Sequence, residues 1–137
     1  MASRDTTPRI INPSCLPDPT PHGYSTAVVT PAAGRLAFIS GLGGHDTDGG
    51  FPPDFGQQVN LAYAHLLAVL ESLGAAPRQV VKLTLFVVGH DMPKLGPLTQ
   101  AVRCAFGDAP PAQTLVPVPR LALDAMLFEV EAVVWLD

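Results

Sequence analysis

The sequence is poor in cysteine and in charged residues. Its two cysteines, Cys15 and Cys104, form no CxxC pair, which excludes a disulfide framework and a zinc cluster, and suits a reducing cytoplasm. Charged residues make up 15% of the chain, and eight Lys and Arg face twelve Asp and Glu. A net charge of −4 provides no basic surface for a phosphate backbone, so we expect no nucleic-acid partner.

Long hydrophobic runs are also missing. No apolar stretch approaches the roughly 20 residues of a membrane helix, and the N-terminus, MASRDTTP, lacks the apolar core of a signal peptide. We therefore expect a soluble, unprocessed, cytoplasmic protein without membrane contact. Even so, 47% of the residues are hydrophobic, more than in an average soluble domain, which indicates that other subunits cover part of the surface.

The length of 137 residues fits a single domain, residues 1–137. Residues 1–23 hold five of the fifteen prolines, which predicts an extended arm because each proline removes a backbone donor. Two strands, over residues 24–30 and 35–40, flank the turn at 31–34 and predict an opening β-hairpin.

Two helical patterns and three further strands follow. Asp54 can cap a helix that ends near Gly74, and its apolar stripe steps by four and three residues: Phe55, Val59, Ala62, Leu66, Val69 and Leu73. Asp91 can cap a second helix that ends at Gly107. The three strands cover residues 80–88, 114–118 and 127–136, and in the first of them Val81, Leu83, Leu85 and Val87 share one face.

The element order β-β-α-β-α-β-β predicts an α+β sandwich of two layers, a mixed sheet with two helices on one face. The other face of that sheet is rich in Val, Leu and Phe but has no helix to cover it. We expect a second copy of the chain to cover it, in a ring of subunits.

Two carboxylates on the last strand are candidates for chemistry. The strand period of two places Glu129 and Glu131 on one face with Val133 and Trp135. Such carboxylates are either solvated, or partly desolvated with a raised pKa that suits a general acid or base. Tyr24, after Gly23, either offers its hydroxyl to a ligand or is half-buried with that hydroxyl satisfied. The sequence leaves both alternatives open.

No metal or dinucleotide site is predicted. The four histidines show no HxH or HxxxH spacing, and the turn at residues 46–49 has too few oxygen ligands for calcium. In a dinucleotide-binding fingerprint, a helix begins directly after the glycines. No helix is predicted directly after the glycine-rich loop at 40–44. Cys104 has no His nearby in sequence to activate it, so we interpret it as structural.

Five segments, taken in order and spacing, resemble the reactive intermediate deaminase (RidA) family, also described as endoribonuclease L-PSP-like. They are residues 23–27 (GYSTA), 39–41 (ISG), 81–87 (VKLTLFV), 111–116 (PAQTLV) and 128–133 (FEVEAV). The resemblance implies a chorismate-mutase-like fold and a homotrimer with clefts between subunits. It further implies hydrolysis of reactive imines and enamines, such as 2-iminobutanoate, without metal or cofactor.

The resemblance also implies roles for particular residues. Glu129 matches a water-positioning glutamate and Tyr24 a pocket tyrosine, and three residues match the pocket wall: Ser40, Gly41 and Phe86. Gln113 stands where the family has a carboxylate-binding arginine, and Leu115 where a cysteine is common. Both changes make the inferred cleft less positive and more apolar.

Arg120 does not readily replace the missing arginine, because seven positions along a strand span about 20 Å. Small 2-imino acids are therefore doubtful substrates. The sequence favours an enzyme that acts on a neutral imine or enamine. The alternative is a non-catalytic, ligand-binding or regulatory trimer.

Overall fold

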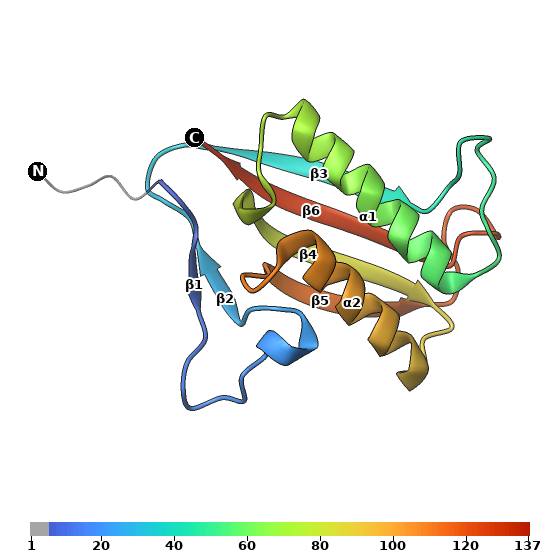
Figure 1. Cartoon of the computed structure of the whole chain (residues 1–137), viewed down its shortest axis with the longest axis horizontal. Coiled ribbons are helices and arrows are strands. Elements are labelled where there is room, and N and C mark those ends of the chain that lie inside the picture. Colours follow the sequence, from blue (N-terminus) through green and yellow to red (C-terminus); the bar gives the residue numbers. More distant parts are fainter. Residues whose placement is uncertain (1–5) are drawn as a thin grey trace, which may run out of the picture.

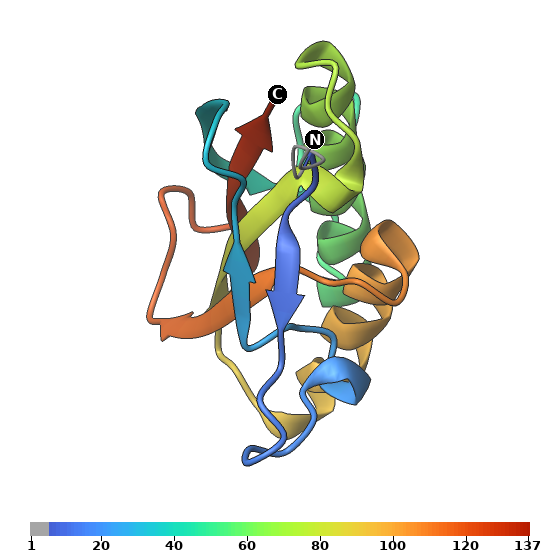
Figure 2. The same cartoon turned by 90° about the vertical axis from the view of Figure 1, so that its left-hand side faces the viewer.

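The computed structural model describes residues 6–137, and these form a sheet layer covered by a helix layer (Figure 1). The main sheet has the strand order β3-β6-β4-β5; β4 runs antiparallel to β6 and parallel to β5. Its strands are β3 (Arg35–Gly43), β4 (Val80–Val88), β5 (Ala112–Val118) and β6 (Phe128–Leu136). Helices α1 (Phe55–Ser72) and α2 (Leu95–Phe106) lie on the same side of this sheet (Figure 2). The predicted two-layer α+β fold is confirmed.

The predicted opening hairpin is wrong. Strand β2 (Ala27–Val29) pairs antiparallel with β1 (Arg9–Ile11), a strand inside the proline-rich arm, while β3 pairs with β6. Ser25 forms a bridge with Ala112, so the segment before β2 lies at the β5 edge of the sheet and β3 at the opposite edge. Strand β1 of the arm thus takes the place beside β2 that β3 would occupy in a local hairpin.

Helix α1 begins and ends as expected, but its buried stripe drifts. The Asp54 carboxylate accepts a hydrogen bond from the Gln57 backbone N–H at 2.9 Å, and Gly74 has the left-handed φ of +67°. The last part of the predicted stripe is wrong, since Leu70 is buried and Leu73 is 38% exposed. A pattern that repeats every seven residues moves by about 20° per repeat around a straight helix, and this moves the buried line onto Leu70.

Strand β4 begins with an irregularity that changes its buried face. The register with β6 shifts between Val80 and Lys82, so Val80 is buried and Val81 is only partly covered. The remaining predicted residues of that face, Leu83, Leu85 and Val87, are completely buried.

The start of α2 also differs from expectation. A short 3₁₀ turn (Met92–Lys94) precedes it, and Asp91 makes no side-chain cap. Its carboxylate instead accepts a hydrogen bond from Lys94 Nζ at 3.1 Å.

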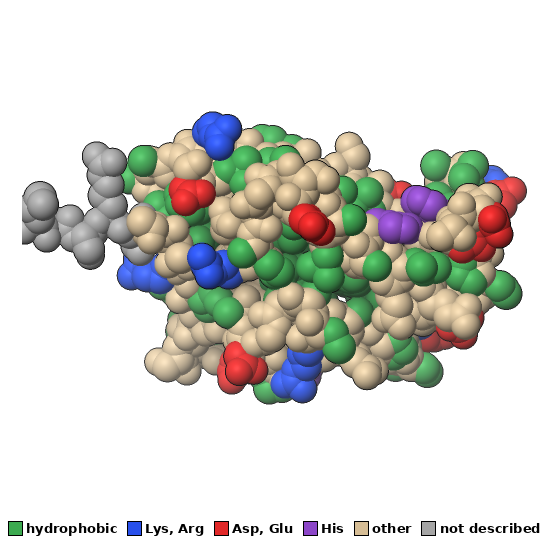
Figure 3. All heavy atoms as spheres, turned by 45° about the horizontal axis from the view of Figure 1, so that its top comes forward, with side chains coloured by type: hydrophobic (Ala, Val, Ile, Leu, Met, Phe, Trp, Pro, Cys, Tyr) green, Lys and Arg blue, Asp and Glu red, His purple; other side chains and the backbone are tan. Residues whose placement is uncertain are grey.

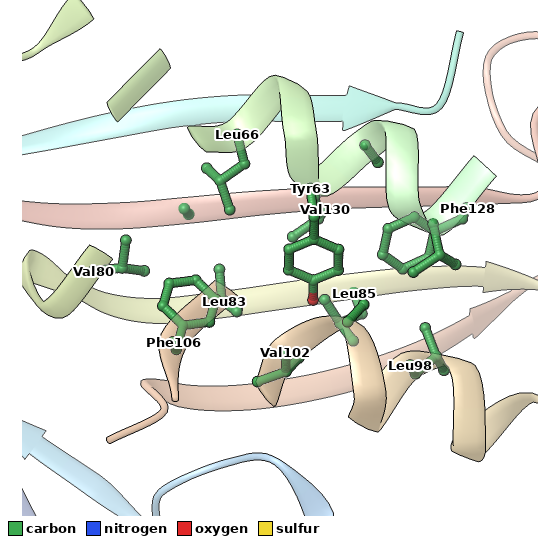
Figure 4. Close-up of a cluster of buried hydrophobic side chains, with 14 of the residues drawn as sticks. Tyr63, Leu66, Val80, Leu83, Leu85, Leu98, Val102, Phe106, Phe128 and Val130 are labelled. Carbon is green, nitrogen blue, oxygen red and sulfur yellow. The ribbon is translucent and has the colours of Figure 1, made fainter. Parts of the chain in front are cut away.

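The core fills the space between the helices and the sheet (Figure 4). Tyr63 of α1 stacks on Phe128 of β6, with ring centroids 6.0 Å apart. The opposite face of the sheet is uncovered, and its β3 side chains are exposed, Phe38 by 76% and Leu36 by 52%. None of the helices described is both long and apolar enough to cross a bilayer.

Candidate functional site

Glu129 lies on the uncovered face of the sheet. Its neighbours in β6, Phe128 and Val130, are completely buried in the core, so the alternation of the strand directs Glu129 away from the helices. Burial raises the pKa of the Glu129 carboxyl above its usual value, and the charge of Glu131 raises it further. This favours the partly desolvated carboxylate over the fully solvated one.

A glycine makes room for this carboxyl. The pairing of β3 with β6 shifts between Ile39 and Leu42, which places Gly41 against Glu129. A Cβ atom on Gly41 would overlap the Glu129 carboxyl oxygen Oε1, so this position accepts only glycine at the observed geometry. Ser40 is exposed beside Gly41, and Phe86 is the cross-strand partner of Glu129 on β4. The structure thus brings four predicted residues together in one half of the site.

Gln113 belongs to a second half, on the other side of the sheet. It is the register partner of Leu83, which is completely buried under the helices, and Leu115, two residues on, packs against the same core. Glu129 is level with Phe86, and Phe86 with Val116 of β5. Three residues along the strands, about 10 Å, two strand spacings across the sheet, about another 10 Å, and the thickness of the sheet therefore separate Gln113 from Glu129.

Tyr24 accompanies Gln113. The backbone N–H of Ser25 donates to the Pro111 carbonyl at 3.0 Å, which holds the half-buried Tyr24 at the beginning of β5. The predicted site thus consists of two halves in one protomer: Tyr24, Gln113 and Leu115 at the β5 edge, and Ser40, Gly41, Phe86 and Glu129 on the open face.

Two positively charged side chains near these halves already form hydrogen bonds with other residues of the protomer. Lys82 lies on the open face and donates to Thr114 Oγ1 at 2.7 Å. Arg120 donates to Asp124 Oδ1 at 2.6 Å in the exposed connection between β5 and β6. Neither side chain is in a position to place a positive charge beside Gln113 in this protomer.

Gln58 of α1 is a buried residue that sequence reasoning missed. Its Nε2 donates to the Pro52 and Ala125 carbonyls, at 2.8 and 2.9 Å, and its Oε1 accepts from the Leu127 N–H at 2.8 Å. It thereby fixes the chain two residues before Glu129. Its burial could have been inferred from its position in the sequence, because residue 58 lies four residues before Ala62 and therefore on the same side of the helix.

Histidines gather on the surface at the end of β3. His65 Nδ1 lies 3.0 Å from the Gly43 carbonyl, and His65 stacks with His45 at 4.3 Å between ring centroids; a histidine patch is visible in Figure 3. Over residues 6–137, no three His, Cys, Asp or Glu side chains are placed to hold a metal ion together.

Comparison with known families agrees with this arrangement. The family model described as endoribonuclease L-PSP matches residues 17–136. The chain belongs to the endoribonuclease L-PSP family. Among L-PSP relatives, a RutC family protein of Pyrococcus abyssi is 30% identical over 120 residues, which cover 85% of this chain and 90% of the relative. The match to the RutC family protein YjgH of Escherichia coli is 40% identical over 65 residues, 47% of either chain.

Solved structures share the L-PSP fold of this chain. YyfB of Yersinia pestis, described as a protein of unknown function in the Rid family, superposes with a TM-score of 0.88 and 32% identity, over 95% of this chain and 99% of YyfB. Rv2704 of Mycobacterium tuberculosis superposes with a TM-score of 0.64 over 95% of this chain and 100% of its own; at 24% identity this likeness concerns the fold alone. The family assignment made from the five sequence segments is confirmed.

Proposed function

We propose that this L-PSP family protein is a homotrimeric, deaminase-like enzyme that hydrolyses or transforms a small, neutral imine or enamine in clefts between its subunits, with no cofactor. The main observation in support of this proposal is that the Glu129 carboxyl lies against Gly41 and has a raised pKa. A carboxyl in that state holds and releases protons more readily near neutral pH than a solvated one.

In one protomer the two halves of the predicted site lie apart, and assembly into a trimer can bring them together. The exposed Phe38 and Leu36 on the open face favour coverage by another copy, since a patch of this kind on a weakly charged protein typically marks an interface. Such packing can set the Gln113 half of one subunit opposite the Glu129 half of its neighbour. The cleft between them is where the ligand binds.

In the proposed reaction, Glu129 positions a water molecule and accepts its proton. The water oxygen adds to the imine carbon, and Glu129 passes the water proton to the imine nitrogen, which gives a carbinolamine. Glu129 then accepts the hydroxyl proton of the carbinolamine and delivers it to the nitrogen, the carbon–nitrogen bond breaks, and ammonia leaves as the carbon–oxygen double bond forms. Gln113 holds a carbonyl or amide group of the substrate by hydrogen bonds.

Ammonia release tests this proposal. We expect wild type to hydrolyse 2-iminobutanoate, generated in situ, slowly, because no guanidinium holds its carboxylate. The variant Gln113→Arg should gain roughly 10-fold or more on this substrate, and adding Glu129→Ala should abolish the gain. Fast turnover by wild type would refute the altered substrate preference. Full activity of Glu129→Ala would refute the role of the carboxyl.

The uncharged Gln113 also favours a second candidate, a trimer that binds a ligand without transforming it. If a small ligand binds in the clefts but no imine yields ammonia, this non-catalytic function would be favoured. A ribonuclease is the weaker alternative, because the net charge is negative and charged side chains are sparse on the face drawn in Figure 3.

A further inference from the structure

We infer that a cavity between the two sheets is a binding site for a small monocarboxylate with a hydrocarbon body. The two-stranded sheet of β1 and β2 lies beside the beginnings of β4 and β5 (Figure 1), and a cavity of about 230 Å³ remains between them. None of the predicted site residues lines this cavity. The inference therefore does not depend on the proposed function.

The walls of the cavity are mostly apolar. Ile10 of β1 and Val28 of β2 are register partners and both line the cavity, so one face of the two-stranded sheet is turned towards it. Further apolar wall comes from the beginning of β4 and from the connection between α2 and β5, through Val80, Pro110 and Pro111. Because proline has no backbone N–H, the two prolines offer no donor there. Such walls favour a ligand with a hydrocarbon body.

Arg78 is the one charged residue among the described residues that line the cavity. It lies in a short 3₁₀ turn (Pro77–Gln79). The buried side chain of Gln79 anchors this turn, because its Oε1 accepts from the Ala76 N–H at 2.8 Å and its Nε2 donates to the Trp135 carbonyl at 3.0 Å. The backbone that carries Arg78 is thus fixed against the main sheet.

The charge of Arg78 determines the polar end of the ligand. Within residues 6–137, the ion pairs involve Lys94 and Arg120 and not Arg78. A guanidinium group binds a carboxylate through two parallel, charge-assisted hydrogen bonds, and Thr7, which lines the same cavity, has a hydroxyl that can donate another. One positive charge beside apolar walls matches one carboxylate, since the walls offer nothing to solvate a second negative charge.

The volume limits the size of the hydrocarbon body. A water molecule occupies about 30 Å³ of the liquid, so a cavity of about 230 Å³ holds a ligand of roughly eight non-hydrogen atoms. A branched acid such as 4-methylpentanoate has this size. Its carboxylate matches Arg78, and its hydrocarbon chain matches the apolar walls.

Three probes test the inference on the full chain by NMR shift titration, followed at the backbone amides of Ile10, Val28 and Val80. The probe 4-methylpentanoate has both features, 4-methylpentanamide lacks the charge, and acetate lacks most of the hydrocarbon. We expect 4-methylpentanoate to bind at least about 10-fold more tightly than the amide, which forms weaker hydrogen bonds with Arg78. It should also bind at least about 10-fold more tightly than acetate, which buries less apolar surface. Equal affinities for the acid and the amide, or no shift at these three amides, would overturn the inference.

Two variants and a matched control locate the site. Arg78→Gln removes the charge at an exposed position and should weaken the binding of 4-methylpentanoate at least about 10-fold, to the level of the amide. Ala109→Phe fills the cavity from an exposed position in its wall and should abolish the binding of both. Arg103→Gln removes the same charge from α2, outside this cavity, and should bind 4-methylpentanoate as wild type does.

Two results with these variants would contradict the inference. If Arg78→Gln and Arg103→Gln weaken the binding equally, the net charge of the protein accounts for the effect and Arg78 forms no site. If Ala109→Phe binds 4-methylpentanoate as wild type does, the acid binds outside this cavity.

Discussion

At the scale of single residues, the contact between Gly41 and Glu129 defines the candidate site. The bulge in β3 brings a backbone without a side chain against a carboxyl on β6. Desolvation and the neighbouring Glu131 act in the same direction on that carboxyl, and both raise its pKa. Two measurements follow from this contact.

The first is the effect of pH on stability. Because the pKa of Glu129 is raised by folding, the folded state holds this proton more tightly than the unfolded state does. Its stabilising contribution is complete below the unfolded pKa of about 4.3 and is lost as pH rises through the higher folded pKa. We expect Glu129→Gln to raise the urea midpoint relative to wild type at pH 7, and the difference to shrink towards pH 3.5. The exposed Glu71 provides the control, since Glu71→Gln should show no such trend.

The second is the cost of a methyl group at Gly41. In Gly41→Ala, the new Cβ meets the Glu129 carboxyl, so this flexible side chain must turn away, and the free energy of unfolding should fall by about 0.5–1.5 kcal/mol. Ammonia release should fall more than stability accounts for. In helix α2, Gly96 has no atom within 4 Å of its Cβ position, and Gly96→Ala should be neutral or slightly stabilising. Equal effects of both substitutions in urea unfolding would contradict this view of Gly41.

At the scale of elements, the sequence predicted the two helices, the core strands and the alternation of β6, because periodicity and capping are local. It did not predict the strand in the arm, since the pairing of Arg9 with Val29 depends on residues distant in sequence. The drift of the stripe to Leu70 arises from helix geometry over several turns. Gln113 and Glu129 were grouped by resemblance, and only the register of the sheet shows that they occupy opposite faces.

The connection between α1 and β6 depends on Gln58. Replacing it in Gln58→Leu leaves two carbonyls and one N–H unpaired in a buried place, and we expect a loss of about 3 kcal/mol or more in the free energy of unfolding. Hydrogen exchange of the Leu127 amide should accelerate as well. The adjacent Gln57 is exposed, so Gln57→Leu is the matched control and should change neither quantity appreciably. A Leu127 amide that stays protected in Gln58→Leu would argue against the clamp.

At the scale of the whole molecule, one layer of helices leaves half of the sheet surface without cover. Figure 2 shows this from the side, with both helices beyond one face and the connection between β5 and β6 projecting from the other. The exposed apolar side chains of Leu36 and Phe38 lie on this open face, where a partner can dock.

Charge introduced on that face should disrupt the assembly. Phe38 is 76% exposed, and we expect Phe38→Lys to shift the sedimentation coefficient from trimer to monomer while the circular dichroism spectrum is retained. A lysine at Leu73, which is 38% exposed near the end of α1, should leave the trimer intact. Wild type that sediments as a monomer at all concentrations would remove the proposed assembly, and with it the shared cleft.

The attachment of the Tyr24 segment to β5 has a consequence for the order of folding. The Ser25 hydroxyl donates to the Pro110 carbonyl across 85 positions of sequence, so this contact closes more than half of the chain into a loop. Loop-closure entropy delays contacts of that length until nearer pairs have formed. We therefore expect the pairings of β4 with β5 and with β6, whose partners lie much nearer in sequence, to become protected first during refolding. The Tyr24 segment docks beside Gln113 later, as β3 does on β6, so a nascent chain completes the proposed ligand-binding edge only after the centre of its sheet.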